Sequence, residues 1–136
     1  MKINTLGNIT YSASDLADFL VCHHLTHLNR LDLETPLEKT ASDEQAMLLQ
    51  EKGIAHERAY LEWLRGQGKR IVEINVAKGT SREQQIADTR AAMRAGAEVI
   101  YQAVFEQLPF MGMIDFLLRE EQPSHLGTWR YAVADT

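Results

Sequence analysis

Apolar residues recur near the helical period in three stretches of the chain, and each stretch predicts a helix. The first runs over 15–30, with a serine before it as the cap. The second runs over 43–65, opens on a capping box and ends at Gly66. The third follows the capping box at 80–83 and stops at Gly96. The apolar faces of the first two helices are predicted to contain Leu16, Phe19, Leu20 and Leu28, and Met47, Ile54, Leu61 and Leu64, respectively.

The remaining apolar stretches are shorter and rich in β-branched and aromatic residues, which favours strands. The strands are predicted over 69–76, 97–105, 110–119 and 128–135. The last three follow one another through short loops that contain proline and glycine, which indicates an antiparallel three-stranded meander. With N-terminal helices packed on that meander, the predicted fold class is α+β, or mixed α/β.

Composition is that of an ordinary globular chain of one domain. It has 136 residues, 45% hydrophobic and 24% charged, and no apolar run reaches the roughly 20 residues that span a bilayer. The N-terminus lacks the pattern of a signal peptide, and Cys22 is the single cysteine, so we expect a cytoplasmic protein without a membrane partner. A net charge of -5 argues against nucleic-acid binding, although uncounted divalent ions can mask such a site.

Asp115 and Asp135 stand in two of the predicted strands, each among apolar neighbours. A carboxylate in such a place is costly to bury unless it is paired, hydrogen-bonded or bound to a metal. Hard cations such as Mg²⁺ and Mn²⁺ accept one or two protein carboxylates, with water and phosphate completing the shell. The two acids therefore predict a metal site, while spacing alone fits solvated strand ends at least as well.

His56 and Glu57 on the long helix are further candidates, since imidazole can bind Mn²⁺. Both also fit a solvent-facing helix surface. Cys22, His23 and His27 suggest zinc, but a structural zinc site needs four ligands, usually in two pairs, and the second pair is missing. A small buried thiol beside surface histidines is the simpler interpretation. A histidine-rich metal-binding helix stays open as a rival.

Six segments, taken together and in order, resemble the start of a RecB-like nuclease of the PD-(D/E)XK superfamily. They are Tyr11-Ser-Ala-Ser-Asp-Leu16, Cys22-His-His-Leu25, Gly53-Ile-Ala-His-Glu57, Val99-Ile-Tyr-Gln-Ala103, Phe110-Met-Gly-Met-Ile-Asp115 and Pro123-Ser-His-Leu-Gly-Thr-Trp-Arg-Tyr-Ala-Val-Ala-Asp-Thr136. The resemblance covers nearly the whole chain. It implies a metal-dependent DNA nuclease with a truncated restriction-endonuclease-like core.

The resemblance also assigns roles to residues of this chain. It implies that Asp115 and Asp135 are catalytic and hold Mg²⁺ or Mn²⁺ with His56 and the backbone carbonyl of Thr136. Gln102, on the preceding strand, is a candidate substrate contact, while an ordinary position in the sheet fits it at least as well. The family places a lysine two residues after the second acid, one position beyond the last residue of this sequence.

We therefore expect 1–136 to be a single incomplete nuclease domain, with a helical part at 1–68 and a sheet-bearing catalytic part at 69–136. The resemblance implies a longer DNA-processing parent, with a fused or associated helicase-like or RNase-H-like domain. In that parent, Cys22 would be one ligand of a 4Fe-4S cluster. The rival hypothesis is a non-catalytic interaction module with a nuclease fold. Arg119 and Arg130 are candidate phosphate contacts, although isolated arginines are usually solvated surface.

Overall fold

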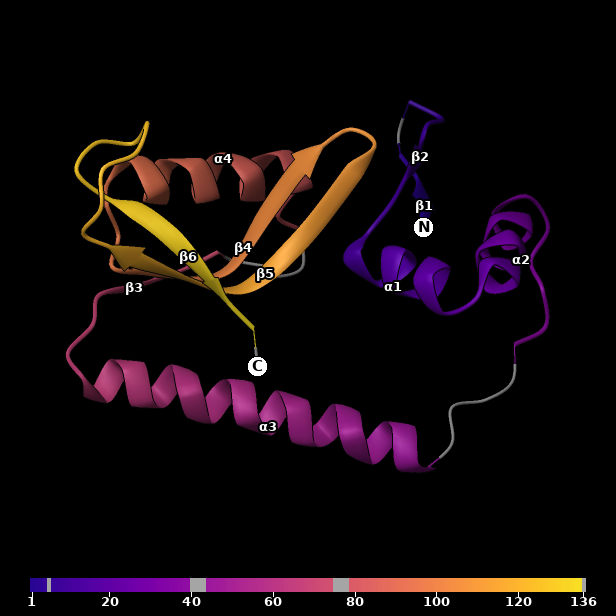
Figure 1. The fold of residues 1–136 in the computed structure, drawn as a ribbon, viewed down its shortest axis with the longest axis horizontal. Coiled ribbons are helices and arrows are strands. Elements are labelled where there is room, and N and C mark those ends of the chain that lie inside the picture. Colours follow the sequence, from indigo (N-terminus) through magenta and orange to yellow (C-terminus); the bar gives the residue numbers. More distant parts are fainter. Residues whose placement is uncertain (5, 40–43, 75–78, 136) are drawn as a thin grey trace. The chain divides into compact units, whose positions relative to one another are not determined.

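The computed structural model describes residues 1–4, 6–39, 44–74 and 79–135. The chain forms two compact units, drawn together in Figure 1. The first unit comprises Met1–Ala41 together with Phe105–Gly112, and the second comprises Ser42–Val104 together with Met113–Thr136. Each unit is described below by itself.

The first unit contains two short strands and two helices. Strand β1 (Lys2–Ile3) pairs antiparallel with β2 (Ile9–Thr10), and these are followed by helices α1 (Ala13–Val21) and α2 (His23–Glu34). Tyr11 continues the backbone pairing, because its N–H donates to the carbonyl of Pro109 and its carbonyl accepts from Met111, each at 2.9 Å. The two strands were not predicted from the sequence, since two residues are too few to show an alternation.

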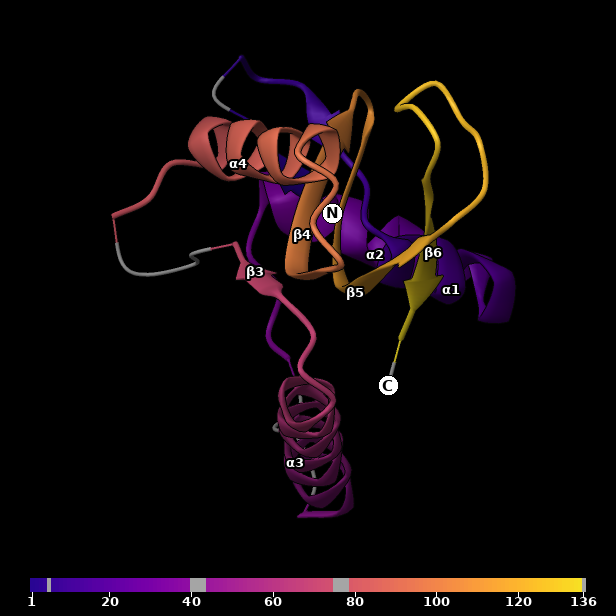
Figure 2. The same ribbon diagram turned by 90° about the vertical axis from the view of Figure 1, so that its left-hand side faces the viewer.

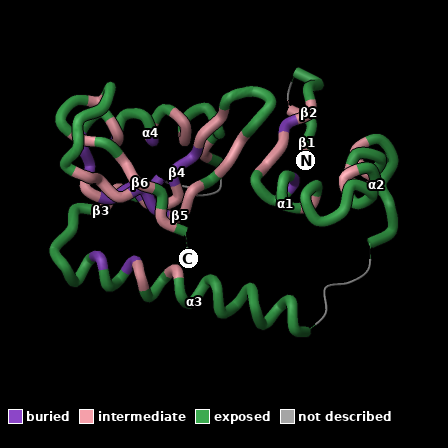
Figure 3. Tube along the Cα trace, in the orientation of Figure 1, coloured by how far each residue is buried: buried purple, intermediate pink, exposed green. Residues whose placement is uncertain are grey.

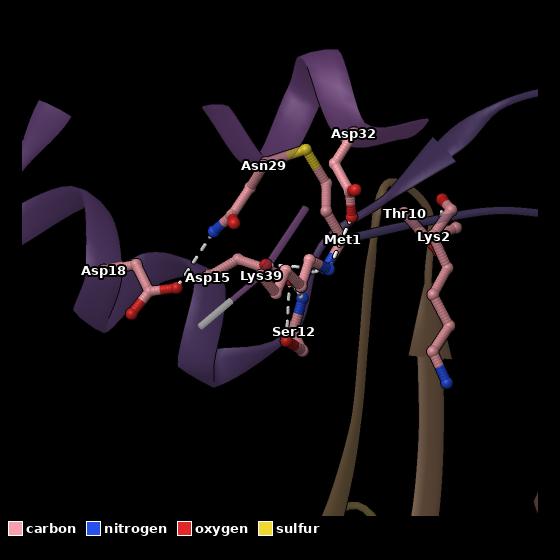
Figure 4. Close-up of polar contacts among 9 residues, drawn as sticks. All are labelled: Met1, Lys2, Thr10, Ser12, Asp15, Asp18, Asn29, Asp32 and Lys39. Carbon is pink, nitrogen blue, oxygen red and sulfur yellow. Dashed lines mark hydrogen bonds and ion pairs between the residues drawn. The ribbon is translucent and has the colours of Figure 1, made fainter. Parts of the chain in front are cut away.

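A buried carboxylate organises the start of α1 (Figure 4). Asp15 lies 2.5 and 2.6 Å from the Met1 ammonium nitrogen and accepts hydrogen bonds from the backbone and the hydroxyl of Ser12, both at 2.7 Å. Ser12 and Asp15 thereby form a capping box. Burial alone would raise the pKa of Asp15, but these hydrogen bonds and the ammonium charge outweigh burial and hold the pKa below its usual value.

The prediction of one helix over 15–30 is wrong at Cys22, where the helix is interrupted. Cys22 has extended backbone angles (φ -156°, ψ 106°) and ends α1 while it begins α2. Its N–H donates to the carbonyl of Asp18 and its carbonyl accepts from Leu25. The Asn29 side-chain amide donates a hydrogen bond to the Asp18 carboxylate at 3.1 Å, which connects the two helices. Cys22 is also exposed, which corrects the prediction of a buried thiol.

The second unit has a mixed four-stranded sheet. Its elements in chain order are α3 (Glu44–Gly66), β3 (Ile71–Glu73), α4 (Arg82–Arg94), β4 (Val99–Gln107), β5 (Phe110–Glu120) and β6 (Arg130–Ala134), with the tip of β4 and β5 belonging to the first unit. The strand order is β3-β4-β5-β6. The α+β class is confirmed, and β5 and β6 pair antiparallel as expected of the meander. The first predicted strand joins the same sheet parallel to β4, because α4 is the crossover connection that a parallel pair requires.

Helix α3 packs on the sheet through its C-terminal half. Leu61 and Leu64 are buried against Val99 and Phe116. Figure 3 shows this part of α3 with buried and half-buried positions while the rest of the helix is exposed. The predicted apolar face is therefore correct at Leu61 and Leu64, but Met47 and Ile54 are exposed, since the sheet extends under only part of the helix.

Helix α4 and the C-terminal half of α3 lie on different sides of the sheet, as Figures 1 and 2 show. Neighbouring residues of a strand point to opposite faces, so Ile100 and Leu117 point away from the α3 side. Both are almost completely buried. The core of the second unit thus has two layers, one on each face of the sheet.

Candidate functional site

The two candidate acids lie on neighbouring strands of the second unit. The register of β5 and β6 pairs Leu117 with Val133 and Phe116 with Ala134. Extending this register by one residue sets Asp135 opposite Asp115. Residues that are directly opposite in an antiparallel pair have Cβ atoms about 4.5–5.5 Å apart. Continued one residue past the end of β6, the register would bring together two carboxylates that the sequence separates by 20 positions, with Asp115 half-buried and Asp135 exposed.

A second group of polar side chains gathers where α3 crosses β4. The Gln102 side-chain amide nitrogen donates to Glu57 Oε1 at 3.3 Å and to the Tyr101 hydroxyl at 3.2 Å. Tyr101 and Gln102 are chain neighbours, which in a regular strand would point to opposite faces. Gln102 has a positive φ of 55°, an unusual angle for a non-glycine residue. This local twist turns both side chains to the α3 side, where they meet Glu57.

The surroundings of the Tyr101 hydroxyl are strongly negative. Burial, then the hydrogen bond and the charge of Glu57, and then the charges of Asp115 and Glu73 raise the pKa of Tyr101 to about 12. Tyr101 is therefore a neutral hydrogen-bond donor at physiological pH. The influence of Asp115 on this hydroxyl also connects the acid pair with the Glu57, Tyr101 and Gln102 group, which together we call the acid–tyrosine site.

The sequence-predicted ligands are brought together only in part. His56 is exposed on α3, one residue before Glu57, and Thr136 lies outside the described residues. Among residues 1–4, 6–39, 44–74 and 79–135, no three His, Cys, Asp or Glu side chains gather closely enough to hold a metal ion. The metal set of His56, Asp115, Asp135 and Thr136 therefore stays a prediction. Cys22 belongs to the first unit, at the junction of α1 and α2.

Sequence reasoning singled out Glu57 and Gln102 separately but missed their contact, and it missed Tyr101 altogether. A signal for Glu57 is present in the helix periodicity. Residues 57, 60, 61 and 64 fall on one face at spacings of three and four, so Glu57 shares a face with buried Leu61 and Leu64. No local pattern indicates the positive φ of Gln102.

The two arginines considered as phosphate contacts have intramolecular partners. Arg130 Nε lies 2.6 Å from Glu120 Oε2, across the β5–β6 pair. Arg119 donates to the carbonyl of Gly96 at 2.9 Å, contacts Glu121 at 2.9 Å and lies 5.0 Å from the Trp129 ring centroid. These contacts place Arg119 at the C-terminal end of α4, in a structural role.

Comparisons with protein-family models, with curated proteins and with solved structures found no match for this chain. Within the part of the chain that the structure describes, no helix combines the length and the apolar character needed to cross a bilayer.

Proposed function

We propose that this chain carries the active site of a metal-dependent DNA nuclease of the RecB-like type, which hydrolyses phosphodiesters as part of a longer DNA-processing protein. The observation that supports the proposal is the β5–β6 register, whose continuation by one residue past Ala134 would set Asp135 opposite Asp115. The acid–tyrosine site beside this pair adds support. The sequence resemblance to the PD-(D/E)XK superfamily supplies the reaction class, and a cytoplasmic location fits it.

The donors at the site suit a hard divalent cation. Carboxylate oxygens are the preferred ligands of Mg²⁺ and Mn²⁺. A bound cation also reduces the repulsion between neighbouring carboxylates. Asp115 and Asp135 would hold the ion, with His56 and the Thr136 carbonyl as the further ligands that the resemblance implies. When bound, such an ion polarises a phosphoryl oxygen and lowers the pKa of a coordinated water.

The remaining residues of the site position the acids. Glu57 accepts from Tyr101 and Gln102, so β4 is fastened to α3, and the charge of Asp115 acts on the same Tyr101 hydroxyl. Tyr101 stays protonated at neutral pH because its pKa is about 12, and it therefore adds no further negative charge to the site. We assign Glu57, Tyr101 and Gln102 as positioning residues, since their hydrogen bonds hold α3 against β4, the strand beside β5, which carries Asp115.

The test is Mn²⁺ binding combined with digestion of labelled DNA, in the chain and in Asp115→Asn and Asp135→Asn. Both substitutions keep the side-chain volume and remove one charge. Glu51→Gln is the matched control, because it removes an equally negative charge from an exposed position of α3. We expect both aspartate variants to lose Mn²⁺ affinity and Mn²⁺-dependent cleavage, while the control keeps both.

Equal Mn²⁺ binding in all four proteins would contradict the proposal. If the wild-type chain does not bind Mn²⁺, the rival interpretation holds, namely a non-catalytic interaction module. A 4Fe-4S cluster and helicase-like or RNase-H-like partners remain proposals for a longer parent protein.

A further inference from the structure

An exposed tryptophan stands at the end of a chain of aromatic contacts in the second unit. Phe116 is fully buried, and the edge of Tyr60 meets it with ring centroids 4.9 Å apart and planes at 88°. Trp63 stacks nearly parallel to Tyr60, at 5.6 Å and 15°. Trp63 nevertheless remains 56% exposed. The core thus supports a large, ordered aromatic side chain whose surface is open to a ligand.

Trp63 lines a cavity of about 540 Å³ between the last turns of α3 and the sheet. The lining residues are Tyr60, Trp63, Leu64, Gln67, Lys69, Glu98, Val99, Leu118 and Arg119. The volume is typical of sites for small organic molecules. Two of the charged lining residues, Lys69 and Arg119, are basic, and each has a carboxylate partner, Glu98 and Glu121 respectively.

Lys69 is available for an anion at the mouth of this cavity. Its ammonium lies 3.5 Å from Glu98, and both side chains are more than 40% exposed. Such surface ion pairs contribute little stability, so an incoming phosphate can replace the carboxylate at low cost. An aromatic platform beside an exposed cation is an arrangement that proteins use for single-stranded nucleic acid.

We propose that this cavity is a subsite for one unpaired nucleotide of single-stranded DNA. The base stacks on Trp63, and Lys69 contacts the adjacent phosphate. The choice of nucleic acid as ligand rests on the proposed nuclease function. Single-stranded DNA is favoured over a duplex because a paired base already has neighbours on both of its faces, whereas an unpaired base offers one face to the indole.

The position of the cavity fits a strand that continues to the acid–tyrosine site. Tyr60, Trp63 and Leu118 line the cavity on the α3 face of the sheet, the same face to which Tyr101 and Gln102 turn to meet Glu57. The aromatic contacts run the same way, because Tyr101 lies 5.2 Å from Phe116, the residue that supports Tyr60. Single-strand sites extend over about 4 nucleotides or more, so one strand can reach both places.

The experiment measures fluorescence anisotropy of labelled oligothymidylate in EDTA at low salt, which removes divalent ions from the comparison. The proteins are wild type, Trp63→Ala and Trp63→Phe, with the folded state checked by circular dichroism. The second probe is an oligonucleotide of equal length whose central sugars carry no base, and the third is a duplex. The abasic probe keeps the phosphates, so it separates stacking from charge.

We expect Trp63→Ala to weaken oligothymidylate binding by about tenfold, whereas Trp63→Phe stays close to wild type. Wild type should bind the abasic probe about as weakly as Trp63→Ala binds oligothymidylate, and should bind the duplex more weakly than the single strand. Lys69→Ala should reduce the slope of log affinity against log salt concentration by about 1, because one phosphate contact is lost.

The subsite is overturned if wild type does not bind oligothymidylate, if Trp63→Ala binds it as tightly as wild type, or if the abasic or duplex probe binds equally well. Because these measurements contain no metal, their failure is distinct from failure of the nuclease. If wild type binds oligothymidylate but does not bind Mn²⁺, the catalytic proposal is rejected while the subsite stands.

Discussion

The hydroxyl of Thr89, on α4, accepts a hydrogen bond from the backbone N–H of Val104, on β4, at 3.0 Å. The same hydroxyl donates to the carbonyl of Gln85 one helical turn earlier, at 2.9 Å. Thr89 is fully buried and Val104 nearly so. A helix and a strand are therefore joined inside the core by a side chain that satisfies a backbone donor of the strand.

Thr89→Val should destabilise the second unit by about 1–3 kcal/mol, because the Val104 N–H would remain buried without an acceptor. Thr89→Ser keeps the hydroxyl and should lose less stability, since it removes only a methyl group. Urea unfolding followed by circular dichroism compares the two. Equal losses in both variants would show that the methyl group, and not the hydrogen bond, contributes the stability.

Gly96→Ala should destabilise the turn after α4 by about 1–2 kcal/mol. Gly96 has a φ of +67°, where a side chain is strained, and an added Cβ would meet Arg119 Nη1 at 3.1 Å and the Trp129 ring at 3.4 Å. Gly53→Ala is the matched control, because Gly53 lies inside α3 with open space around its Cβ position. The control should stabilise the protein by about 0.5–1 kcal/mol. In urea unfolding, the free energy of unfolding should fall in Gly96→Ala and rise in Gly53→Ala.

Asp15 should make the stability of the first unit depend on pH. Its folded-state pKa lies below the usual value of 3.8, so its stabilising contribution is present above about pH 4 and is lost as the pH falls through the folded pKa. Asp15→Asn should cost about 2 kcal/mol near neutral pH, as is typical of hydrogen bonds to a charged group, and should flatten the acid dependence. Unfolding midpoints between pH 3 and pH 7 measure both effects. An unchanged acid dependence in the variant would contradict the assignment.

Tyr101 should ionise near pH 12, about two units above an ordinary tyrosine. Its contribution to stability is fully present below about pH 10 and is lost as the pH rises toward 12. Glu57→Gln should lower the pKa of Tyr101, because it removes the nearest negative charge. The difference in tyrosinate absorbance between each protein and its Tyr101→Phe version isolates this group. If Glu57→Gln leaves the titration of Tyr101 unchanged, the interaction between Glu57 and the Tyr101 hydroxyl is contradicted.

Much of the candidate site could be anticipated from residues in isolation. Asp115 and Asp135 are conspicuous because carboxylates are costly among apolar strand neighbours, and that cost is readable without coordinates. Whether the two acids face one another depends on strand register. A shift of one residue would move a whole strand's side chains to the other face, and no single strand contains that information.

The sequence by itself determined the long helix Glu44–Gly66, the helix Arg82–Arg94 and the approximate strands, because periodicity, capping residues and glycine stops act over a few neighbouring positions. Only the tertiary structure decided the interruption at Cys22, the positive φ of Gln102 and the exposure of Met47 and Ile54. These features depend on which surfaces meet in the folded chain. Packing between distant segments overrides local preference wherever a contact stabilises the fold by more than the local conformation costs.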